Sequence, residues 1–442
     1  SQEDAAATAQ RMEMFDYDGR GNRTSEIRDA QGIRQMTATK YDAFGRIERF
    51  VDGNNVVYLS KYEGIGRAIE TWLEGPGGQR RLERVVYDAF ARVVEKHDGT
   101  GQVTRFAYNT ANRTMTTTTP EGVEVVTQSN AHGQTIKVTD GQLRTTSYIY
   151  RADGQLERTD LPTVDGVVDP RNEYDDAGRL SDSYDAKGNH VKYEYDAANR
   201  LLHRTVDPAG LKLKTSYEYD TSGRVIKLTD PNGAATTTKF DAAGRMELQI
   251  VDDVPGGLQM RTQYEYLEGG RLLRVTDSNN RVTETRFDAL GRRQEDVVDP
   301  QGLALRTQYE YDGNNNVVAR VEANARTRFV YDSQNRQRFS IDALGLVTEN
   351  QYDNAGRLTR STRYAQALSN LATLPVLPKE EDVSSRLQPA PGRDAVDARF
   401  YDNDGRLSYQ VDGTGAVVHF EYEAKTNNLV KRTAFAKFSD GG

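Results

Sequence analysis

A six-residue phrase recurs from one end of this sequence to the other and constrains the fold more strongly than any other feature. The phrase is Tyr-Asp-x-x-Gly-Arg, and clear copies stand at residues 41–46, 174–179 and 352–357. Self-similarity at a period of about 20–50 residues is typical of repeat proteins, in which each unit packs only against its neighbours. A length of 442 residues would otherwise suggest about three ordinary domains. The repeat instead predicts one long array.

Eighteen copies align when the aromatic residue is taken as the first position of each unit. The long interval after residue 352 holds four of the 12 Pro residues, and we interpret about 365–396 as an insertion that lies on or plugs the repeat structure. We therefore divide the chain into an N-terminal segment, 1–14, and a repeat region, 15–442. The 18 units begin at Phe15, Tyr41, Tyr62, Tyr87, Tyr108, Ser129, Tyr150, Tyr174, Tyr195, Tyr219, Phe240, Tyr266, Phe287, Tyr311, Tyr331, Tyr352, Tyr401 and Tyr422.

The phrase has the composition of a tight hairpin turn. Its fifth position is Gly in twelve units and Asn in four (Asn112, Asn199, Asn315, Asn335), and only Ala91 and Thr426 differ. Gly and Asn are the residues that most readily adopt a left-handed backbone. The Asp at position two can accept backbone N–H groups at the start of a type I turn. Such a turn joins antiparallel strands, so the Tyr should end one strand and the Arg should start the next.

A second turn stands midway through most units, for example at Asp207-Pro208-Ala209-Gly210 and at Asp412-Gly413-Thr414-Gly415. The short segments between the turns have the composition of strands. Each unit thus holds two strands, and the whole array predicts about 36 strands at a spacing of about 4.8 Å. A sheet of that length cannot stay flat. We predict an all-β fold, a β-hairpin solenoid whose long antiparallel sheet is curved or spiral and wraps around a space.

The composition fits a thin sheet and excludes several classes of function. Hydrophobic residues make up 36% of the chain, and Tyr is the main aromatic residue, with 24 copies. The net charge is −8 with both signs interspersed, which argues against nucleic-acid binding, because that needs clustered Lys and Arg. The chain has no Cys, so disulfides and thiolate metal sites are excluded. We find no run of 18 apolar residues and predict no membrane insertion.

The sequence shows no constellation typical of catalysis or of a bound cofactor. The five His residues, His97, His132, His190, His203 and His419, are far apart, and we find no phosphate loop, nucleophile elbow or zinc-protease phrase. Two runs, 52–55 and 312–316, begin like calcium loops but lack the spaced carboxylate and the terminal Glu. We interpret both as turns, and we predict a non-enzymatic protein without cofactor or metal.

The residues expected to carry the structure are those of the phrase itself. We expect each Arg to pair with neighbouring Asp or Glu or to stack on the Tyr of an adjacent unit; a basic ladder for an anionic partner is the alternative. We expect the Tyr residues to pack between units, with a platform for sugar rings as the alternative. Four complete phrases define the structural repeat sites: Tyr41, Asp42, Gly45 and Arg46; Tyr174, Asp175, Gly178 and Arg179; Tyr219, Asp220, Gly223 and Arg224; Tyr352, Asp353, Gly356 and Arg357.

This phrase, followed by a downstream Asp-x-x-Gly turn, resembles the YD repeat of the RHS-repeat proteins over nearly the whole chain. The resemblance implies a long β-strip wound into a hollow shell. In bacterial insecticidal toxin complexes and polymorphic toxins such a shell encloses a toxic C-terminal segment, and in animal teneurins a similar shell serves cell adhesion. The resemblance therefore implies a shell segment of a secreted or cell-surface bacterial protein, whose main partner is the rest of its own larger polypeptide, including a C-terminal toxin.

Two alternative functions stay open at this point. Bacterial members carry an aspartyl self-cleavage site within a phrase like Asp-Pro-x-Gly-Leu, which occurs here at 207–211 and 299–303. Both copies stand in ordinary mid-repeat positions, so we interpret Asp207 and Asp299 as turn residues rather than as cleavage sites. The second alternative is a cell-surface adhesin that binds glycans through its repeated Tyr residues. Containment predicts a curved strip with a polar concave face, whereas adhesion predicts exposed tyrosines.

Overall fold

The strands of this protein form one antiparallel sheet in which each strand pairs with its neighbours in sequence. The computed structural model describes residues 12–29, 33–75, 78–163, 166–267 and 269–435, so most of the expected N-terminal segment, 1–11, lies outside the described residues. The 36 strands are β1 (Glu13–Tyr17), β2 (Arg23–Arg28), β3 (Gln35–Tyr41), β4 (Ile47–Val51), β5 (Val57–Tyr62), β6 (Ala68–Gly75), β7 (Gly78–Tyr87), β8 (Val93–His97), β9 (Val103–Asn109), β10 (Thr114–Thr118), β11 (Glu124–Ser129), β12 (Thr135–Thr139), β13 (Thr145–Tyr150), β14 (Leu156–Asp160), β15 (Arg171–Tyr174), β16 (Leu180–Tyr184), β17 (His190–Tyr195), β18 (Leu201–Val206), β19 (Leu213–Tyr219), β20 (Val225–Thr229), β21 (Ala235–Phe240), β22 (Met246–Val251), β23 (Met260–Tyr266), β24 (Leu272–Thr276), β25 (Val282–Phe287), β26 (Arg293–Val298), β27 (Leu305–Tyr311), β28 (Val317–Glu322), β29 (Ala325–Tyr331), β30 (Gln337–Ile341), β31 (Val347–Tyr352), β32 (Leu358–Arg363), β33 (Ala395–Tyr401), β34 (Leu407–Val411), β35 (Val417–Tyr422) and β36 (Leu429–Phe435).

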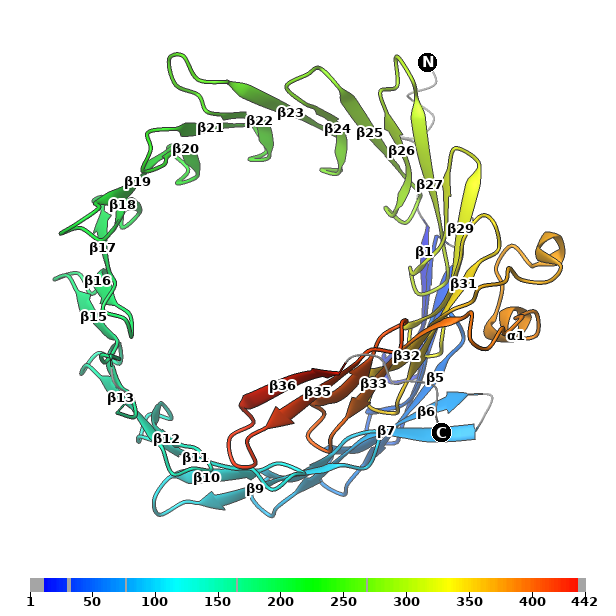
Figure 1. Cartoon of the computed structure of the whole chain (residues 1–442), viewed down its shortest axis with the longest axis horizontal. Coiled ribbons are helices and arrows are strands. Elements are labelled where there is room, and N and C mark those ends of the chain that lie inside the picture. The colour runs from blue at the N-terminus through cyan, green and yellow to red at the C-terminus, as the bar shows by residue number, and fades with distance from the viewer. Residues whose placement is uncertain (1–11, 30–32, 76–77, 164–165, 268, 436–442) are drawn as a thin grey trace.

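The sheet curls into a ring and then overlaps its own beginning, as Figure 1 shows. The expected all-β, curved antiparallel sheet is therefore confirmed, and the number of strands among the described residues is the predicted one. Because the strands alternate in direction, the turns that follow odd-numbered strands lie on one edge of the strip and those that follow even-numbered strands lie on the other. We call the first set the YD turns and the second set the mid-unit turns.

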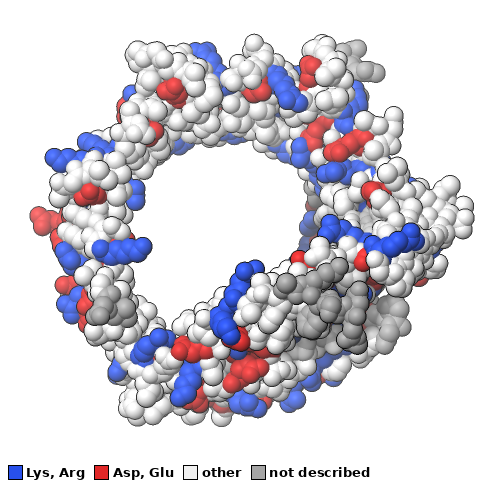
Figure 2. Space-filling view, viewed as in Figure 1, with Lys and Arg blue, Asp and Glu red and all other residues white. Residues whose placement is uncertain are grey.

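The overlap joins mid-unit turns of the first spiral layer to YD turns of the second. The turn after β4 meets the turn after β27, and the turn after β12 meets the turn after β35, through contacts of Asn54 with Asp312 and of Gln142 with Glu423. Each contact thus joins turns that are 23 strands apart. At about 4.8 Å per strand, one spiral turn has a circumference of about 110 Å. Figure 2 shows the wide opening that this ring surrounds.

The insertion between β32 and β33 covers the outside of the ring. It contains a 3-10 helix, η1 (Leu371–Thr373), and a short α-helix, α1 (Glu380–Ser384), and Figure 1 shows it beyond β29 and β31 on the outer side. Val383 of α1 packs with Phe339 and Ile341 of β30, and all three side chains are fully buried. The segment therefore lies on the convex face and does not plug the interior.

The structure corrects the expected repeat register in three turns. β1 ends at Tyr17 and its turn is closed by Gly21, so the first unit begins at Tyr17 and not at Phe15. Ala91 adopts the left-handed backbone that the sequence pattern assigns to Gly or Asn. In two other turns the left-handed residues are Arg113 and Asn427, one position after the expected Asn112 and Thr426. Both turns are one residue longer than the others, since Asn109 pairs with Thr114 and the Glu423 N–H donates to the carbonyl of Asn428.

Candidate functional site

The second residue of each YD phrase organises its own turn. The Asp175 Oδ1 atom accepts the backbone N–H groups of Ala177 at 3.0 Å and of Arg179 at 2.9 Å. Gly178 closes the turn with a φ of 76°, which is the left-handed region where a side chain is strained. The N–H of Asp175 in turn donates to the carbonyl of Arg179 at 2.9 Å. The carboxylate therefore replaces solvent as the partner of the turn's backbone donors.

The sixth residue of the phrase connects neighbouring units. The guanidinium of Arg179 pairs with the Asp175 carboxylate at 2.7 Å and donates to the carbonyl of Asp196 in the next YD turn at 3.2 Å. It also lies 4.8 Å from the centre of the Tyr195 ring, within the range of a cation–π contact. The Tyr195 hydroxyl donates back to the carbonyl of Leu180 at 2.9 Å. One arginine thus fixes its own turn, the next turn and the next Tyr.

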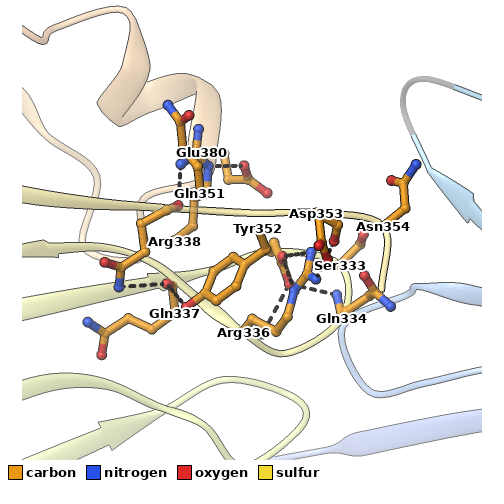
Figure 3. A network of polar contacts seen from close by, with 12 residues as sticks. Ser333, Gln334, Arg336, Gln337, Arg338, Gln351, Tyr352, Asp353, Asn354 and Glu380 are labelled. Carbon is orange, nitrogen blue, oxygen red and sulfur yellow. Dashed lines mark hydrogen bonds and ion pairs between the residues drawn. The ribbon is translucent and has the colours of Figure 1, made fainter. Parts of the chain in front are cut away.

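The same arrangement recurs along the strip, and we call it the Tyr–Arg ladder. Figure 3 shows it around Tyr352, where Arg336 lies against the ring and the Tyr352 hydroxyl donates to the carbonyl of Gln337 at 2.9 Å. For the other arginines named from the sequence, Arg46 stacks on Tyr62, Arg224 on Phe240 and Arg357 on Tyr401. For the other tyrosines, the hydroxyls of Tyr41, Tyr174 and Tyr219 donate to the carbonyls of Arg23, Leu156 and Leu201.

The ladder continues across the insertion. Arg357 precedes the insertion and Tyr401 follows it, yet the guanidinium lies 4.9 Å from the ring centre. The Tyr401 hydroxyl donates to the carbonyl of Leu358 at 2.8 Å. β32 and β33 pair directly through Arg360 and Ala398. The insertion therefore leaves the sheet as a loop and does not interrupt the repeat contacts.

Hydrogen bonds within the ladder lower the pKa of its carboxylates and so favour their ionised form. The pKa of Asp175 is lowered, first by the hydrogen bond from the Arg179 side chain and then by the Arg179 backbone N–H. Backbone and side-chain hydrogen bonds from Arg224 likewise lower the pKa of Asp220. Burial raises the pKa of Tyr195. Ionised Asp, permanently charged Arg and neutral Tyr form a fully occupied network, which is the signature of a structural element rather than of a general acid or base.

The position of the insertion identifies which sheet face is concave. Phe339 and Ile341 contact the insertion outside the ring, so their strand neighbour Ser340 faces the interior. Residues paired across strands share a face, and the register carries this assignment along the whole strip. The first position of each YD phrase and the residue two positions before it consequently face inward, as in the Tyr193/Tyr195 and Tyr217/Tyr219 pairs.

From β9 to β25 the paired positions of the concave face are almost free of charge, whereas the convex face of the same strands is strongly charged. From β9 to β25, Arg204 is the one charged residue at a paired inward position of the described strands, and the others are mainly Tyr, Thr, Val, Leu and Phe. The outward positions of the same strands carry ion pairs, such as that of Arg274 with Glu284 at 2.6 Å and that of Lys227 with Glu218 at 3.1 Å. Over these strands the expected polar concave face thus consists of hydroxyl groups and apolar surface. Nearer the two ends of the strip it also carries charges, such as the ion pairs of Lys96 with Glu83 and of Arg363 with Asp397.

The candidate cleavage residues have turn contacts. Asp207 accepts the N–H groups of Gly210 and Leu211 at 3.0 and 2.8 Å, and Asp299 accepts that of Leu303 at 2.9 Å. Both Asp residues have a positive φ. We call the turns at 207–212, 252–259 and 299–304 the wide mid-unit turns. In each of them the Asp carboxylate accepts a backbone N–H of its own turn.

The histidines are separate from one another in space as well as in sequence. His190 contacts Asp182 and stacks on Tyr184, while His419 stacks on Tyr409. Among the described residues, no group of three or more His, Asp or Glu side chains is arranged to hold a metal ion. The described helices are also too short or too polar to cross a membrane.

The two calcium-like runs have a structural role that the sequence did not reveal. Asn54 Nδ2 donates to Asp312 Oδ2 at 2.9 Å, and Asn314 Nδ2 donates to Asp52 Oδ2 at 2.8 Å. The identical tetrapeptides 52–55 and 312–315 therefore clasp each other reciprocally across the overlap. The signal in the sequence was that these two tetrapeptides are identical, because a reciprocal contact of this kind has the same residues on both sides.

Comparison with known proteins identifies the repeat. The RHS Repeat family model matches residues 87–124, 174–212, 219–259 and 266–304, and the last three segments each end in a wide mid-unit turn. No curated protein matches the sequence.

The chain is also similar to solved structures. The chain is similar to the crystal structure of TcdB2-TccC3 without its hypervariable C-terminal region, at 14% identity and a TM-score of 0.51, over 93% of this chain and 30% of that chain. A structure of the Photorhabdus luminescens Tc holotoxin pore also matches, at 14% identity and a TM-score of 0.46, over 93% of this chain and 26% of that one. The chain thus spans less than a third of the TcdB2-TccC3 chain, whose fold it shares.

Proposed function

We propose that this chain, an RHS-repeat protein, is a wall segment of a hollow shell that encloses and shields a polypeptide cargo. The observation that carries the proposal is the division of the sheet, from β9 to β25, into a nearly uncharged concave face and a charged convex face. A folded, soluble cargo would be expected to face a charged wall across water. A neutral wall of Tyr, Thr and aliphatic side chains instead suits contact with unfolded or partly folded chain, whose apolar groups are exposed.

The contact pattern of the sheet explains how such a wall keeps its shape. Each described strand pairs with the next without a break, including across the insertion. The described strands therefore form a continuous wall, with the shortest pairing between β14 and β15, where Arg158 lies opposite Arg171. The Tyr–Arg ladder ties successive hairpins. A continuous hydrogen-bonded sheet of this kind excludes macromolecules while it remains one side chain thick on each face.

We further propose that the cargo is a C-terminal toxin or effector of the same larger polypeptide and that the protein acts outside the bacterial cell, at its surface or after secretion. The fold shared with TcdB2-TccC3, whose crystal structure is described as lacking its hypervariable C-terminal region, supports this assignment. The carbohydrate-binding alternative is less well supported, since the ladder tyrosines use their hydroxyls within the sheet and one ring face against Arg.

Solution X-ray scattering tests the hollow ring. A compact body of this length would have a radius of gyration of about 22 Å, and the ring should give a clearly larger value together with the oscillations of a hollow particle. A value near that of the compact body would mean that the strip has collapsed and would remove the proposal.

Binding of an unfolded probe tests the concave face. We expect reduced, alkylated lysozyme carrying a fluorophore to bind the chain in an anisotropy titration, and native lysozyme not to bind. Replacing Tyr148, Tyr193 and Tyr217 on the concave face with Ser should weaken binding about tenfold or more. The matched control replaces their convex neighbours Ile149, Glu194 and Glu218 with Ser and should leave binding unchanged. Equal effects of the two triple variants would contradict the assigned role of the concave face.

A further inference from the structure

One charged side chain interrupts the nearly uncharged part of the concave face. Arg204 lies on β18, where it pairs across the strands with Tyr193 of β17 and with Thr215 of β19, and it is half-buried. Among the described residues its guanidinium has no hydrogen-bond or ion-pair partner. Arg204 therefore presents its N–H donors to the interior without an acceptor for them.

The wall around Arg204 supplies no counter-ion. Between β9 and β25, no Asp or Glu is at a paired inward position of the described strands, and the nearest one along the strip is Asp296 on β26. The separation from β18 to β26 is about 38 Å along the strip, at about 4.8 Å per strand. Asp207, which is close to Arg204 in sequence, instead accepts backbone N–H groups of its own turn. A charged acceptor for Arg204 can therefore come only from the interior of the ring.

Nearer the two ends of the strip, the concave face supplies ions of both signs. Lys96 pairs with Glu83 at 2.6 Å, and Arg320 pairs with Glu322 at 3.4 Å, all four on the inward side. Cations in those regions are neutralised by the wall itself. Arg204 differs from them, and its planar guanidinium is suited to bind a carboxylate through two parallel N–H···O hydrogen bonds.

The surroundings of Arg204 suit a carboxylate that is carried by a polypeptide. The hydroxyls of Tyr193 and, diagonally across on β19, of Tyr217 have no partner among the described residues, and each can donate a hydrogen bond. Val206 on the same face and Leu213, with which it pairs, add apolar surface. An inorganic anion would use the charge alone, whereas an acidic residue within an apolar segment would use the charge, the hydroxyls and the apolar surface together.

We infer that Arg204 anchors an acidic residue of the enclosed polypeptide to the concave face. The inference rests on the proposed function, since it needs a chain inside the ring, and it adds the chemistry that is recognised, a carboxylate flanked by apolar residues. The carboxylate accepts N–H groups of Arg204, with Tyr193 and Tyr217 on either side. Apolar contact with the rest of the wall has no direction, so the single ion pair fixes where along the wall the chain is held.

Anisotropy titrations with three peptides test the inference. All three are short unfolded sequences of Leu, Thr, Ser and Gly that carry tetramethylrhodamine at the N-terminus. The first has one central Glu and an amidated C-terminus, the second has Gln in its place, and the third has the same Gln and a free C-terminal carboxylate. We expect the first to bind about tenfold more tightly than the second at about 50 mM salt, and to lose most of this preference at about 500 mM salt.

Variants of the chain locate the effect. Arg204→Gln should reduce the affinity for the Glu peptide to that for the amidated Gln peptide and leave the latter unchanged, which also shows that the wall keeps its fold. Arg204→Lys should keep part of the preference, because it retains the charge but not the planar group. Arg261→Gln is the matched control, since Arg261 is exposed on the convex face and also has no ion-pair partner among the described residues. It should bind all three peptides as the wild type does.

The outcomes separate the anchor from the proposed function. Equal affinity of the wild-type chain for the two amidated peptides overturns the inference, and so does a preference that survives Arg204→Gln or high salt. Equal binding of the first and third peptides would assign the site to a terminal carboxylate and overturn the acidic residue. If reduced, alkylated lysozyme binds while the peptides are not distinguished, the anchor alone fails. If neither lysozyme nor any peptide binds, the proposed function fails with it.

Discussion

The ring has a double-layered arc and a single-layered arc, and the two hold together differently. In the double-layered arc, β4–β13 contact β27–β36 through their turns, and the insertion adds a buried cluster that includes Val330, Phe339 and Val347. Among the described residues of the single-layered arc, from β14 to β25, Ala235 and Ile250 are the only buried apolar residues. The same repeat therefore folds both with contacts to a second layer and without them.

The difference shows what the repeat supplies by itself. In the single-layered arc each hairpin is stabilised by its two neighbours alone, through backbone pairing and the Tyr–Arg ladder, so its stability is a sum of nearest-neighbour terms. The double-layered arc adds contacts between residues far apart in sequence. We therefore expect local opening to begin in the single-layered arc and the double-layered arc to open last.

The largest effect should come from the core beneath the insertion. Phe339→Ala removes a fully buried ring that packs on Val383, and such truncations cost about 3–5 kcal/mol. Phe240→Ala, in the single-layered arc, removes a half-buried ring whose contact is Arg224 and should cost clearly less. Hydrogen exchange measures the free energy of local opening in each arc. Equal losses for the two variants would show that the insertion cluster adds nothing to the repeat.

The second effect separates the overlap from the repeat. Gly53→Ala places a Cβ atom against the Gly313 carbonyl, and overpacking of this kind costs about 1–3 kcal/mol. Gly64→Ala is the matched control, because Gly64 is at the third position of a YD phrase, directly after the residue that begins the turn, and has no neighbour within 4 Å. We expect Gly53→Ala alone to raise hydrogen exchange at residues 312–316 and to increase the maximum dimension in X-ray scattering. Identical behaviour of the two variants would mean that the clasp does not hold the layers together.

Local features of this fold follow directly from the sequence. The Gly or Asn at position five and the Asp at position two each have a conformational or hydrogen-bonding role within their own turn, so 18 repeats of the phrase specify the strand number and the antiparallel sheet. The misplaced first unit has a local cause. Phe15-Asp16 and Tyr17-Asp18 both fit the start of the phrase, and Gly19 and Gly21 both fit its fifth position.

Features that depend on the curvature of the whole strip could not be predicted in this way. The meeting of Asp52 with Asn314 requires that 23 strands complete one spiral turn, and that number is a sum of small rotations which no single residue specifies. The side on which the insertion lies is set by the same curvature. The contacts of the Tyr–Arg ladder were predictable in kind, since they join adjacent units, whereas the overlap joins residues about 260 positions apart.

A smaller effect should come from the ladder arginines. Arg179→Lys keeps the positive charge but loses the planar group that stacks on Tyr195 and donates to Asp175 and Asp196 together. We expect a loss of about 0.5–1 kcal/mol in local stability around β17, the usual worth of an exposed cation–π contact. Arg336→Lys makes the same change in a turn of the second layer, and it should reduce protection from exchange less there, because the contact of Gln334 with Arg80 still restrains that turn. A larger loss at Arg336 would reverse the proposed order of the two arcs.

The smallest effect is a pH dependence confined to turns that hold a carboxylate. Hydrogen bonds from Arg179 and Arg224 lower the pKa values of Asp175 and Asp220 from an ordinary value of 3.8. A carboxyl whose pKa is lower in the folded state stabilises the fold above its unfolded pKa and loses that contribution as the pH falls through the folded value. Hydrogen exchange at the hairpins β15–β16 and β19–β20, corrected for intrinsic rates, should therefore indicate weaker protection at about pH 3 than at about pH 5.

The hairpin β11–β12 provides the control for this pH dependence within the same molecule. Its turn uses Asn130 where the other turns use Asp, and the Asn130 Oδ1 atom accepts the N–H groups of His132 and Gln134 at 2.9 and 3.0 Å. The amide has the same hydrogen-bonding geometry without a proton to gain in this range. Protection at this hairpin should therefore change little between the two pH values. A parallel loss at β11–β12 would trace the pH effect to the sheet as a whole, and not to the carboxylates that close its turns.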